Sequence, residues 1–106
     1  MHKFIKKDQA TLRQIAPNKS ALNYITKDLS PNLSFATTEG VDFSETEVCK
    51  YDRIYFVLEG RLVIEVEGET ELLEADDACY LGKGIEYTMS GTFKTVVVNS
   101  PAFGNL

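Results

Sequence analysis

The segment Tyr51–Gly68, YDRIYFVLEGRLVIEVEG, has the clearest β-strand pattern in the chain. Its last third alternates apolar and mostly acidic residues, and this period of two is typical of a half-buried β-strand. Two strands are predicted, Arg53–Leu58 and Leu62–Glu67. Gly60 lies between them and can adopt the positive φ of a tight turn, so the segment is interpreted as a hairpin.

Short apolar runs separated by turn residues continue this pattern on both sides. Further strands are predicted at Ala21–Ile25, Leu33–Thr37, Ser44–Lys50, Thr70–Leu73, Cys79–Leu81, Glu86–Ser90 and Phe93–Asn99, with turns at Gly40 and Gly91. Residues 3–16 suit either a short helix or an extended arm. So many short strands without a long helical pattern predict an all-β sandwich or small barrel. We divide the chain into an N-terminal arm, residues 1–20, and a single barrel domain, residues 21–106.

The composition is that of an ordinary globular domain. The chain has 106 residues, of which 43% are hydrophobic and 25% charged. No apolar run approaches the ~20 residues of a membrane span, so no membrane partner is expected. The N-terminus lacks the apolar core of a signal peptide. We therefore expect a cytoplasmic protein in which Cys49 and Cys79 are reduced thiols.

The charges are unevenly distributed along the chain. Residues 1–27 hold six basic residues and one acidic residue, whereas the whole chain has a net charge of −5. A basic arm of this kind either covers an acidic surface of its own or a partner subunit, or acts as a tether to nucleic acid or a membrane. The acidic body repels phosphates and no aromatic residues alternate with the lysines, so no nucleic-acid partner is expected. A homodimer is predicted instead, because exposed sheet edges and apolar outer faces need cover.

Two segments resemble the conserved motifs of the cupins. Residues 55–60, YFVLEG, followed by a strand that ends in Glu67-Gly68, are similar to the first motif, and residues 77–84, DACYLGKG, are similar to the second. The resemblance covers about residues 33–103. It implies a cupin-like jelly-roll β-barrel, often homodimeric, with a ligand pocket inside. Residues 51–60 are also similar to small cupins of the ethanolamine-utilisation type.

The resemblance fails at the positions that hold metal in this family. Counting from Gly60, Glu47 and Cys49 fall at the positions of two histidines, Arg53 replaces a glutamate, and Tyr87 replaces the third histidine. The chain's single histidine, His2, lies in the arm. A guanidinium is always cationic and cannot coordinate a metal. We therefore predict no metal and no cofactor, with a weak zinc site of Glu47, Cys49 and Tyr87 left as an alternative.

Arg53 instead suggests anion recognition. A guanidinium inside a partly dry barrel offers paired donors to a carboxylate or phosphate. The ligand-binding candidates are Arg53, Cys49, Tyr51 and Tyr55, where the tyrosines supply hydroxyls and ring faces. The alternative is that Arg53 simply pairs with Glu47 and fills the former metal position with an internal ion pair.

Three functions are compatible with these residues. The first is binding of a small carboxylate, phosphate or sugar-like molecule inside the barrel without a metal. The second is a metal-independent isomerase, epimerase or lyase acting on a sugar or a hydroxy or keto acid, with Glu47 and Tyr87 as the catalytic acid–base pair. The third is a structural or regulatory dimer with a filled barrel. Cys49 lacks a nearby histidine base that would activate it as a nucleophile.

Overall fold

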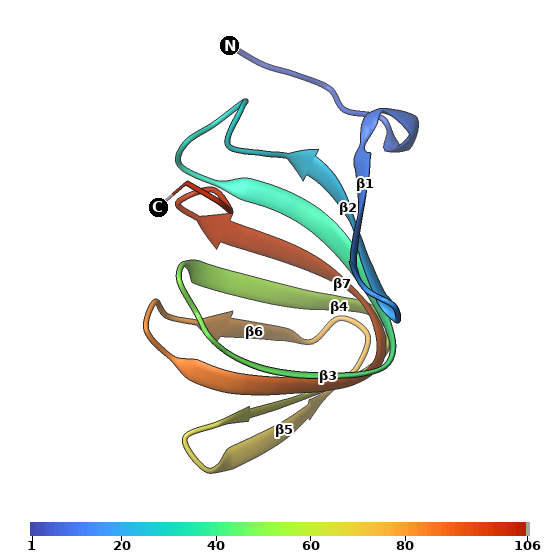
Figure 1. Cartoon of the computed structure of the whole chain (residues 1–106), viewed down its shortest axis with the longest axis vertical. Helices are drawn as coiled ribbons and strands as arrows, with labels where there is room; N and C mark the ends of the chain where they lie inside the picture. The colour runs from blue at the N-terminus through green and yellow to red at the C-terminus, as the bar shows by residue number, and fades with distance from the viewer. Residues whose placement is uncertain (106) are drawn as a thin grey trace.

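The computed structural model describes residues 1–105, and it confirms the all-β jelly-roll prediction (Figure 1). After a 3-10 turn at Lys7–Gln9, the strands are β1 Thr11–Ala16, β2 Lys19–Ile25, β3 Ser34–Val48, β4 Asp52–Val66, β5 Glu69–Leu73, β6 Ala78–Leu81 and β7 Glu86–Ser100. All strand pairs are antiparallel, in the order β1-β2-β3-β7-β4-β5, and β6 pairs with the first half of β4. No helix within residues 1–105 is long and apolar enough to cross a membrane.

Three strands of 15 residues each form the body of the sheet, and the predicted hairpin within one of them is wrong. Strand β4 runs without interruption from Asp52 to Val66, and β7 pairs with it along this whole length. The turns predicted at Gly40 and Gly91 are wrong for the same reason, because β3 and β7 also continue through them. At these points the chain bends instead of reversing, as the right-hand side of Figure 1 shows.

The bend depends on glycines that lie close together in neighbouring strands. Gly60 and Gly91 have φ values of +81° and +129°, and a Cβ on either would collide with a backbone carbonyl oxygen of the adjacent strand. A β-bulge in β4, between Val57 and Glu59, adds local twist at the same level. Each long strand therefore contributes its first half to one layer and its second half to the other, and the two layers face each other.

The apolar core lies between these layers and near the bend. Val57 and Leu62 of β4 are fully buried, and the Phe43 and Phe93 rings meet edge to face with centroids 6.5 Å apart. Leu62 and Ile64 share the buried face, as the alternating pattern predicted. Polar side chains also occupy inward positions, most of them on the layer formed by β2 and the first halves of β3 and β4; the buried polar residues are Lys19, Ser34, Thr38, Arg53, Thr95 and Asn99. The interior of the barrel is thus partly apolar and partly polar.

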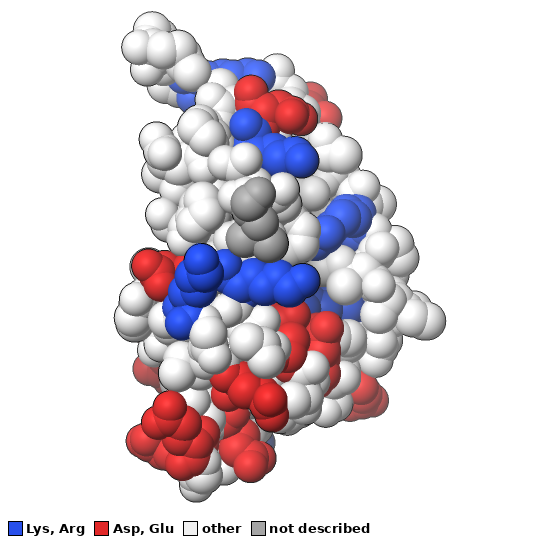
Figure 2. Space-filling model, turned by 60° about the vertical axis from the view of Figure 1, so that its left-hand side comes forward, with Lys and Arg blue, Asp and Glu red and all other residues white. Residues whose placement is uncertain are grey.

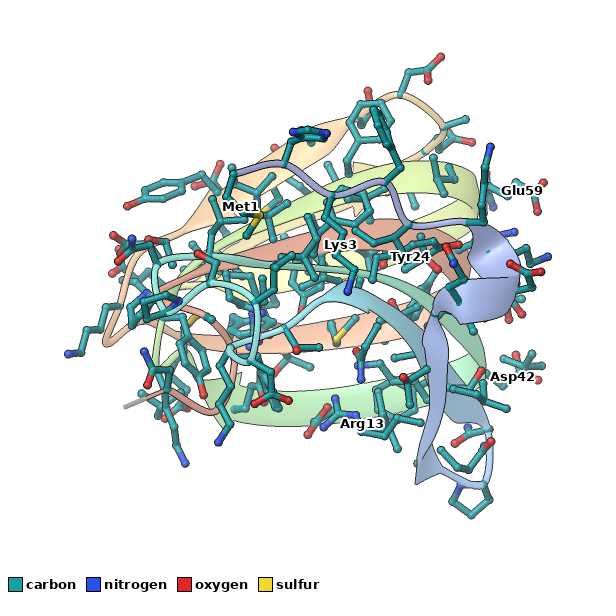
Figure 3. The ribbon with its side chains drawn as sticks, turned by 90° about the horizontal axis from the view of Figure 1, so that it is seen from above. Met1, Lys3, Arg13, Tyr24, Asp42 and Glu59 are labelled. Atoms are coloured by element: carbon teal, nitrogen blue, oxygen red, sulfur yellow. The ribbon has the colours of Figure 1, made fainter. Side chains whose placement is uncertain are left out.

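The N-terminal region joins the sheet earlier than the sequence indicated. Strand β1 pairs with β2, and β2 begins at Lys19, so residues 11–20 belong to the barrel and not to a separate arm. The apolar pattern of β1 is weak because it is an edge strand, in which Leu12 is 66% exposed. Residues 1–10 precede the sheet, and Figure 3 shows Met1 and Lys3 passing over it, while Asp42 and Glu59 lie near the bend.

Candidate functional site

Arg53 is the centre of a polar cluster inside the barrel. It lies on the inward face of β4, where its Nε donates a hydrogen bond of 2.6 Å to Oδ1 of Asn99 on β7. Its Nη1 donates to the carboxylate of Glu47 on β3 and to the hydroxyl of Tyr87 at 2.7 Å. The ion pair between Arg53 and Glu47, which the sequence left as an alternative hypothesis, therefore forms, and it joins the two layers of the barrel.

Two tyrosine hydroxyls complete the cluster. Tyr87 donates to Glu47 at 2.5 Å, so its oxygen acts as the acceptor for Tyr55, whose hydroxyl lies 2.6 Å away. Burial raises the pKa of Tyr55 and of Tyr87, and both phenols are therefore neutral at physiological pH. The result is a directed chain of hydrogen bonds from Tyr55 through Tyr87 to the Glu47 carboxylate.

The charge on Arg53 is strongly maintained. Burial opposes its charged form, but the neighbouring Tyr55, Tyr87 and Glu47 outweigh this effect and raise the pKa of Arg53. The remaining nitrogen, Nη2, has no hydrogen-bond partner among residues 1–105. Every fully enclosed side-chain nitrogen or oxygen in that part of the chain has a partner, so Nη2 must be accessible. The Nη2 edge of the guanidinium is thus the part that a ligand can reach.

This edge adjoins a cavity of about 240 Å³. The charged residues in its wall are Arg13, Lys19, Arg53, Glu45 and Glu47, three potential cations and two potential anions. The rest of the wall combines apolar side chains, such as Ala36 and Val97, with neutral polar ones, such as Thr38 and Asn99. The cavity is therefore a partly apolar space with several basic groups in its wall, which suits a small anion.

Strand β1 and the C-terminal tail close the open end of the cavity. Arg13 extends from β1 (Figure 3), and its guanidinium carbon lies 4.7 Å from the centre of the Phe103 ring. Phe103 packs against Tyr51 with ring centroids 5.5 Å apart. The Tyr51 hydroxyl accepts a hydrogen bond of 2.7 Å from the backbone N–H of Gly104. These contacts place a basic group and an aromatic ring in the cavity wall at this end.

The structure brings four of the six proposed site residues together, and the other two do not line the cavity. Glu47, Arg53 and Tyr55 line the cavity, and Tyr87 lies behind them in contact with all three. Cys49 does not join this cluster, because its buried thiol donates to the Tyr51 carbonyl at 2.9 Å. Tyr51 faces Arg53 with its ring, 5.8 Å from the guanidinium carbon, but its hydroxyl is already bonded to the tail.

Sequence reasoning missed three polar residues of this site. Asn99 orients Arg53, and Lys19 and Arg13 supply further positive charge to the cavity. Asn99 could have been predicted, because it is a polar residue at the next inward position after Phe93 and Val97 on the same strand. Lys19 alternates in the same way with the buried Ala21 on β2. Arg13 gave no such signal, since β1 is exposed along nearly its whole length.

The residues at this position do not fit a divalent metal ion. Within residues 1–105 there is no group of three or more His, Cys, Asp and Glu side chains that could hold one. Arg53 directs a cationic nitrogen at the carboxylate of Glu47, which is the one anionic ligand that the cluster offers. Cys49 is turned towards the backbone and cannot complete a set of ligands. The charge that a metal would supply is supplied here by the guanidinium.

The fold and the cavity inside it define this protein as a small cupin. The chain matches the model of the ethanolamine utilisation protein EutQ family over residues 2–104, and it belongs to that family. A comparison with curated protein sequences finds no match.

Solved structures share the fold at low sequence identity. KdgF from a Halomonas species superposes with a TM-score of 0.87 at 15% identity, over 99% of this chain and 98% of that one. An RmlC-like cupin from Shewanella frigidimarina gives 0.85 at 14%, over 99% and 96%. EutQ from Clostridium difficile gives 0.73 at 22%, over 83% of this chain and 67% of that one. Identities this low establish a common architecture only.

Proposed function

We propose that this protein binds a small organic anion, a carboxylate or sugar acid, inside the barrel without a metal ion. The observation that carries the proposal is the free edge of the Arg53 guanidinium, which adjoins the cavity that Arg13 and Lys19 also line. A guanidinium whose other donors are already bonded is held in one orientation. It therefore presents its remaining N–H groups to a carboxylate with little loss of conformational entropy.

The size of the cavity limits the ligand. Its volume of about 240 Å³ is slightly below the ~300–1,000 Å³ that is usual for sites that hold drug-sized molecules. A compact acid of a few carbon atoms suits it better than a nucleotide or an oligosaccharide. The apolar wall at Ala36 and Val97 would contact the carbon atoms of such an acid, while the basic residues bind its charge.

Acid–base catalysis by Glu47 and Tyr87 remains the alternative. In its favour, Tyr87 donates directly to Glu47, so a proton could pass between them. Against it, Tyr87 does not line the cavity, and burial raises its pKa, which makes it a poor proton donor to a substrate near neutral pH. We therefore favour a binding protein over an isomerase, epimerase or lyase.

Isothermal titration calorimetry with lactate, pyruvate, glucuronate and phosphate tests the proposal, with chloride at equal ionic strength as the reference. Arg13→Gln leaves the Arg53 cluster intact, and we expect it to weaken binding of the best acid by about tenfold, the usual effect of one lost charge-assisted hydrogen bond. Arg61→Gln removes an exposed arginine outside the cavity and should change nothing. The proposal is wrong if no acid binds, or if both variants bind like the wild type.

We further propose that the partner of this chain is a second copy, packed on the outer face of the sheet. Tyr80, Ile54, Val98 and Phe35 are neighbours across four adjacent strands of that face. Tyr80 is 66% exposed and Ile54 is 43% exposed. A continuous apolar row of this kind is typical of an interface.

The distribution of charge favours a second copy as the occupant. Residues 62–82 contain seven acidic residues and no basic ones, whereas residues 1–7 contain three lysines and no acidic residue. In Figure 2 acidic side chains gather at the lower end of the molecule and basic ones lie in its upper and middle parts. A two-fold axis through the apolar row brings the basic end of each copy to the acidic end of the other.

A further inference from the structure

Lys19 is a buried amine that the binding proposal uses only as one positive charge among three. Its side chain projects inward from β2 and is 8% exposed. Nζ lies 3.7 Å from the sulfur of Met89, 4.7 Å from the centre of the Phe43 ring and 3.9 Å from the carboxylate of Glu45. It lines the same cavity as the free edge of Arg53.

Apart from the face of the Phe43 ring, which attracts a cation, these surroundings offer little to an ammonium ion. An ammonium has three N–H donors, and among the described residues the one hydrogen-bond acceptor for them is a thioether sulfur, which is weak. The Glu45 carboxylate is at the outer limit of an ion pair. Lys19 therefore loses much of its hydration on folding and regains few strong contacts in return.

The charged groups around Lys19 act in both directions. Burial lowers the pKa of Lys19. The carboxylates of Glu45 and Glu47 on β3 oppose this change, whereas Arg53 on β4 and Arg13 on β1 add to it. The net direction is downwards, so the neutral amine is more accessible to Lys19 than to an exposed lysine. A neutral amine is a nucleophile, whereas an ammonium is not.

We propose that Lys19 forms a reversible imine with the carbonyl group of an oxo acid, a keto or aldehydic acid, held in the cavity by the free edge of Arg53. This inference rests on the proposed anion binding and narrows it to a ligand class. The arrangement combines a nucleophilic amine with a guanidinium that fixes the carboxylate, so that one small molecule can contact both groups at once.

The bond changes balance without any oxidant or reductant. The lone pair of Nζ adds to the carbonyl carbon, and one of the two amine protons passes to the oxygen to give a carbinolamine. The second amine proton then passes to the hydroxyl group, which leaves as water, and the nitrogen lone pair forms the carbon–nitrogen double bond. Glu45, 3.9 Å from Nζ, is placed to accept the proton that the amine loses and to return it to the leaving hydroxyl.

The other seven lysines provide an internal comparison. They are Lys3, Lys6, Lys7, Lys27, Lys50 and Lys83, which are exposed, and Lys94, which is half-buried and pairs with Glu39 at 3.6 Å. None of the seven lines the cavity, so none can react with an acid that is bound there.

The test is reductive trapping of the wild-type protein with pyruvate and sodium cyanoborohydride at neutral pH, followed by peptide mapping by mass spectrometry. Cyanoborohydride delivers hydride to the imine carbon and makes the link permanent. We expect one adduct per chain, located at Lys19 and formed about tenfold or more faster than at any other lysine, because binding holds the carbonyl beside that amine. Lactate, which has the carboxylate but no carbonyl, should slow the trapping by competition.

Two outcomes overturn the inference, and they separate it from the binding proposal. Labelling that is spread over the exposed lysines, or absent while calorimetry shows that pyruvate and lactate bind, refutes the imine and leaves anion binding intact. Absence of both labelling and binding refutes both proposals. Lys19→Arg keeps the charge but cannot form an imine, and it should lose the adduct; the distribution of label in the wild-type chain decides the question even where this variant fails to fold.

Discussion

Replacing Arg53 by leucine tests whether its internal ion pair holds the two layers of the barrel together. The change leaves the Glu47 carboxylate without its cation and Oδ1 of Asn99 without its donor. Removing one partner of a buried pair typically costs about 3–5 kcal/mol in the free energy of unfolding. Glu47 is 34% exposed and keeps the Tyr87 hydroxyl. We therefore expect a smaller loss, about 2–3 kcal/mol.

A double-mutant cycle separates the ion pair from packing. Arg53→Leu, Glu47→Leu and the double variant are unfolded in urea, and the free energies of unfolding are compared at constant slope. Because the double variant buries no unpaired charge, it should recover about 1–2 kcal/mol of the loss. The exposed pair Arg61–Glu74, with N–O distance 3.7 Å and side chains 70% and 59% exposed, is the matched control. Its coupling should stay below about 0.5 kcal/mol.

The comparison can refute the reasoning directly. If the coupling free energy between Arg53 and Glu47 is no larger than that between Arg61 and Glu74, water replaces the lost contact equally well in both pairs. The ion pair then does not hold the two layers together. If the double variant is instead as unstable as Arg53→Leu, the loss comes from the bonds to Asn99 and the tyrosines, and the ion pair with Glu47 contributes little.

Three further predictions concern the bend, the buried lysine and the partner. Gly91→Ala should lower the free energy of unfolding by more than about 2 kcal/mol, because a Cβ at φ +129° meets a backbone carbonyl oxygen. Gly68→Ala, at φ +81° with open space around it, should lower that free energy by only about 1–2 kcal/mol. Equal losses in urea unfolding would contradict this account. Because the folded pKa of Lys19 lies below its ordinary 10.5, the unfolded chain binds the proton more tightly. Wild-type stability relative to Lys19→Met should therefore rise with pH as it approaches 10.5, and a pH-independent difference would count against the shift. Ile54→Lys should halve the mass measured by light scattering at micromolar concentration while Ser44→Lys does not, and a wild-type monomer would disprove the dimer.

Much of the architecture followed from local pattern, but its longest elements did not. The period of two identified strands and the correct inward face of β4, because burial alone decides that pattern. The bends at Gly60 and Gly91 were predicted as turns because a glycine with positive φ serves a hairpin and a bulged strand equally well. A bent strand differs from a hairpin in that a neighbouring strand pairs with it on both sides of the glycine. A local sequence pattern does not contain this information.

The site was predictable where alternation and family resemblance coincided. Glu47 and Arg53 both lie on inward positions of their strands, and they meet as the motif spacing implied. Cys49 was misplaced because β3 ends at Val48, so the alternation that would have directed the thiol inward stops one residue earlier. The role of Lys19 depends on Met89, 70 residues away along the chain. Contacts over such separations arise from topology, and the sequence pattern alone could not supply them.

The charges in the cavity wall also determine how ligand binding responds to pH. At a pH above the lowered pKa of Lys19 its amine is neutral, and the charges of Arg13 and Arg53 then balance those of Glu45 and Glu47 in the cavity wall. An anion that enters makes the protonated form of Lys19 more favourable, so lactate binding should take up a proton. Its affinity should then fall as pH rises through the lowered pKa of Lys19. Calorimetry in buffers of different ionisation enthalpy measures this uptake, and Lys19→Met should abolish it. Proton uptake that persists in Lys19→Met would assign the titration to another group and remove the link between the buried amine and the anion.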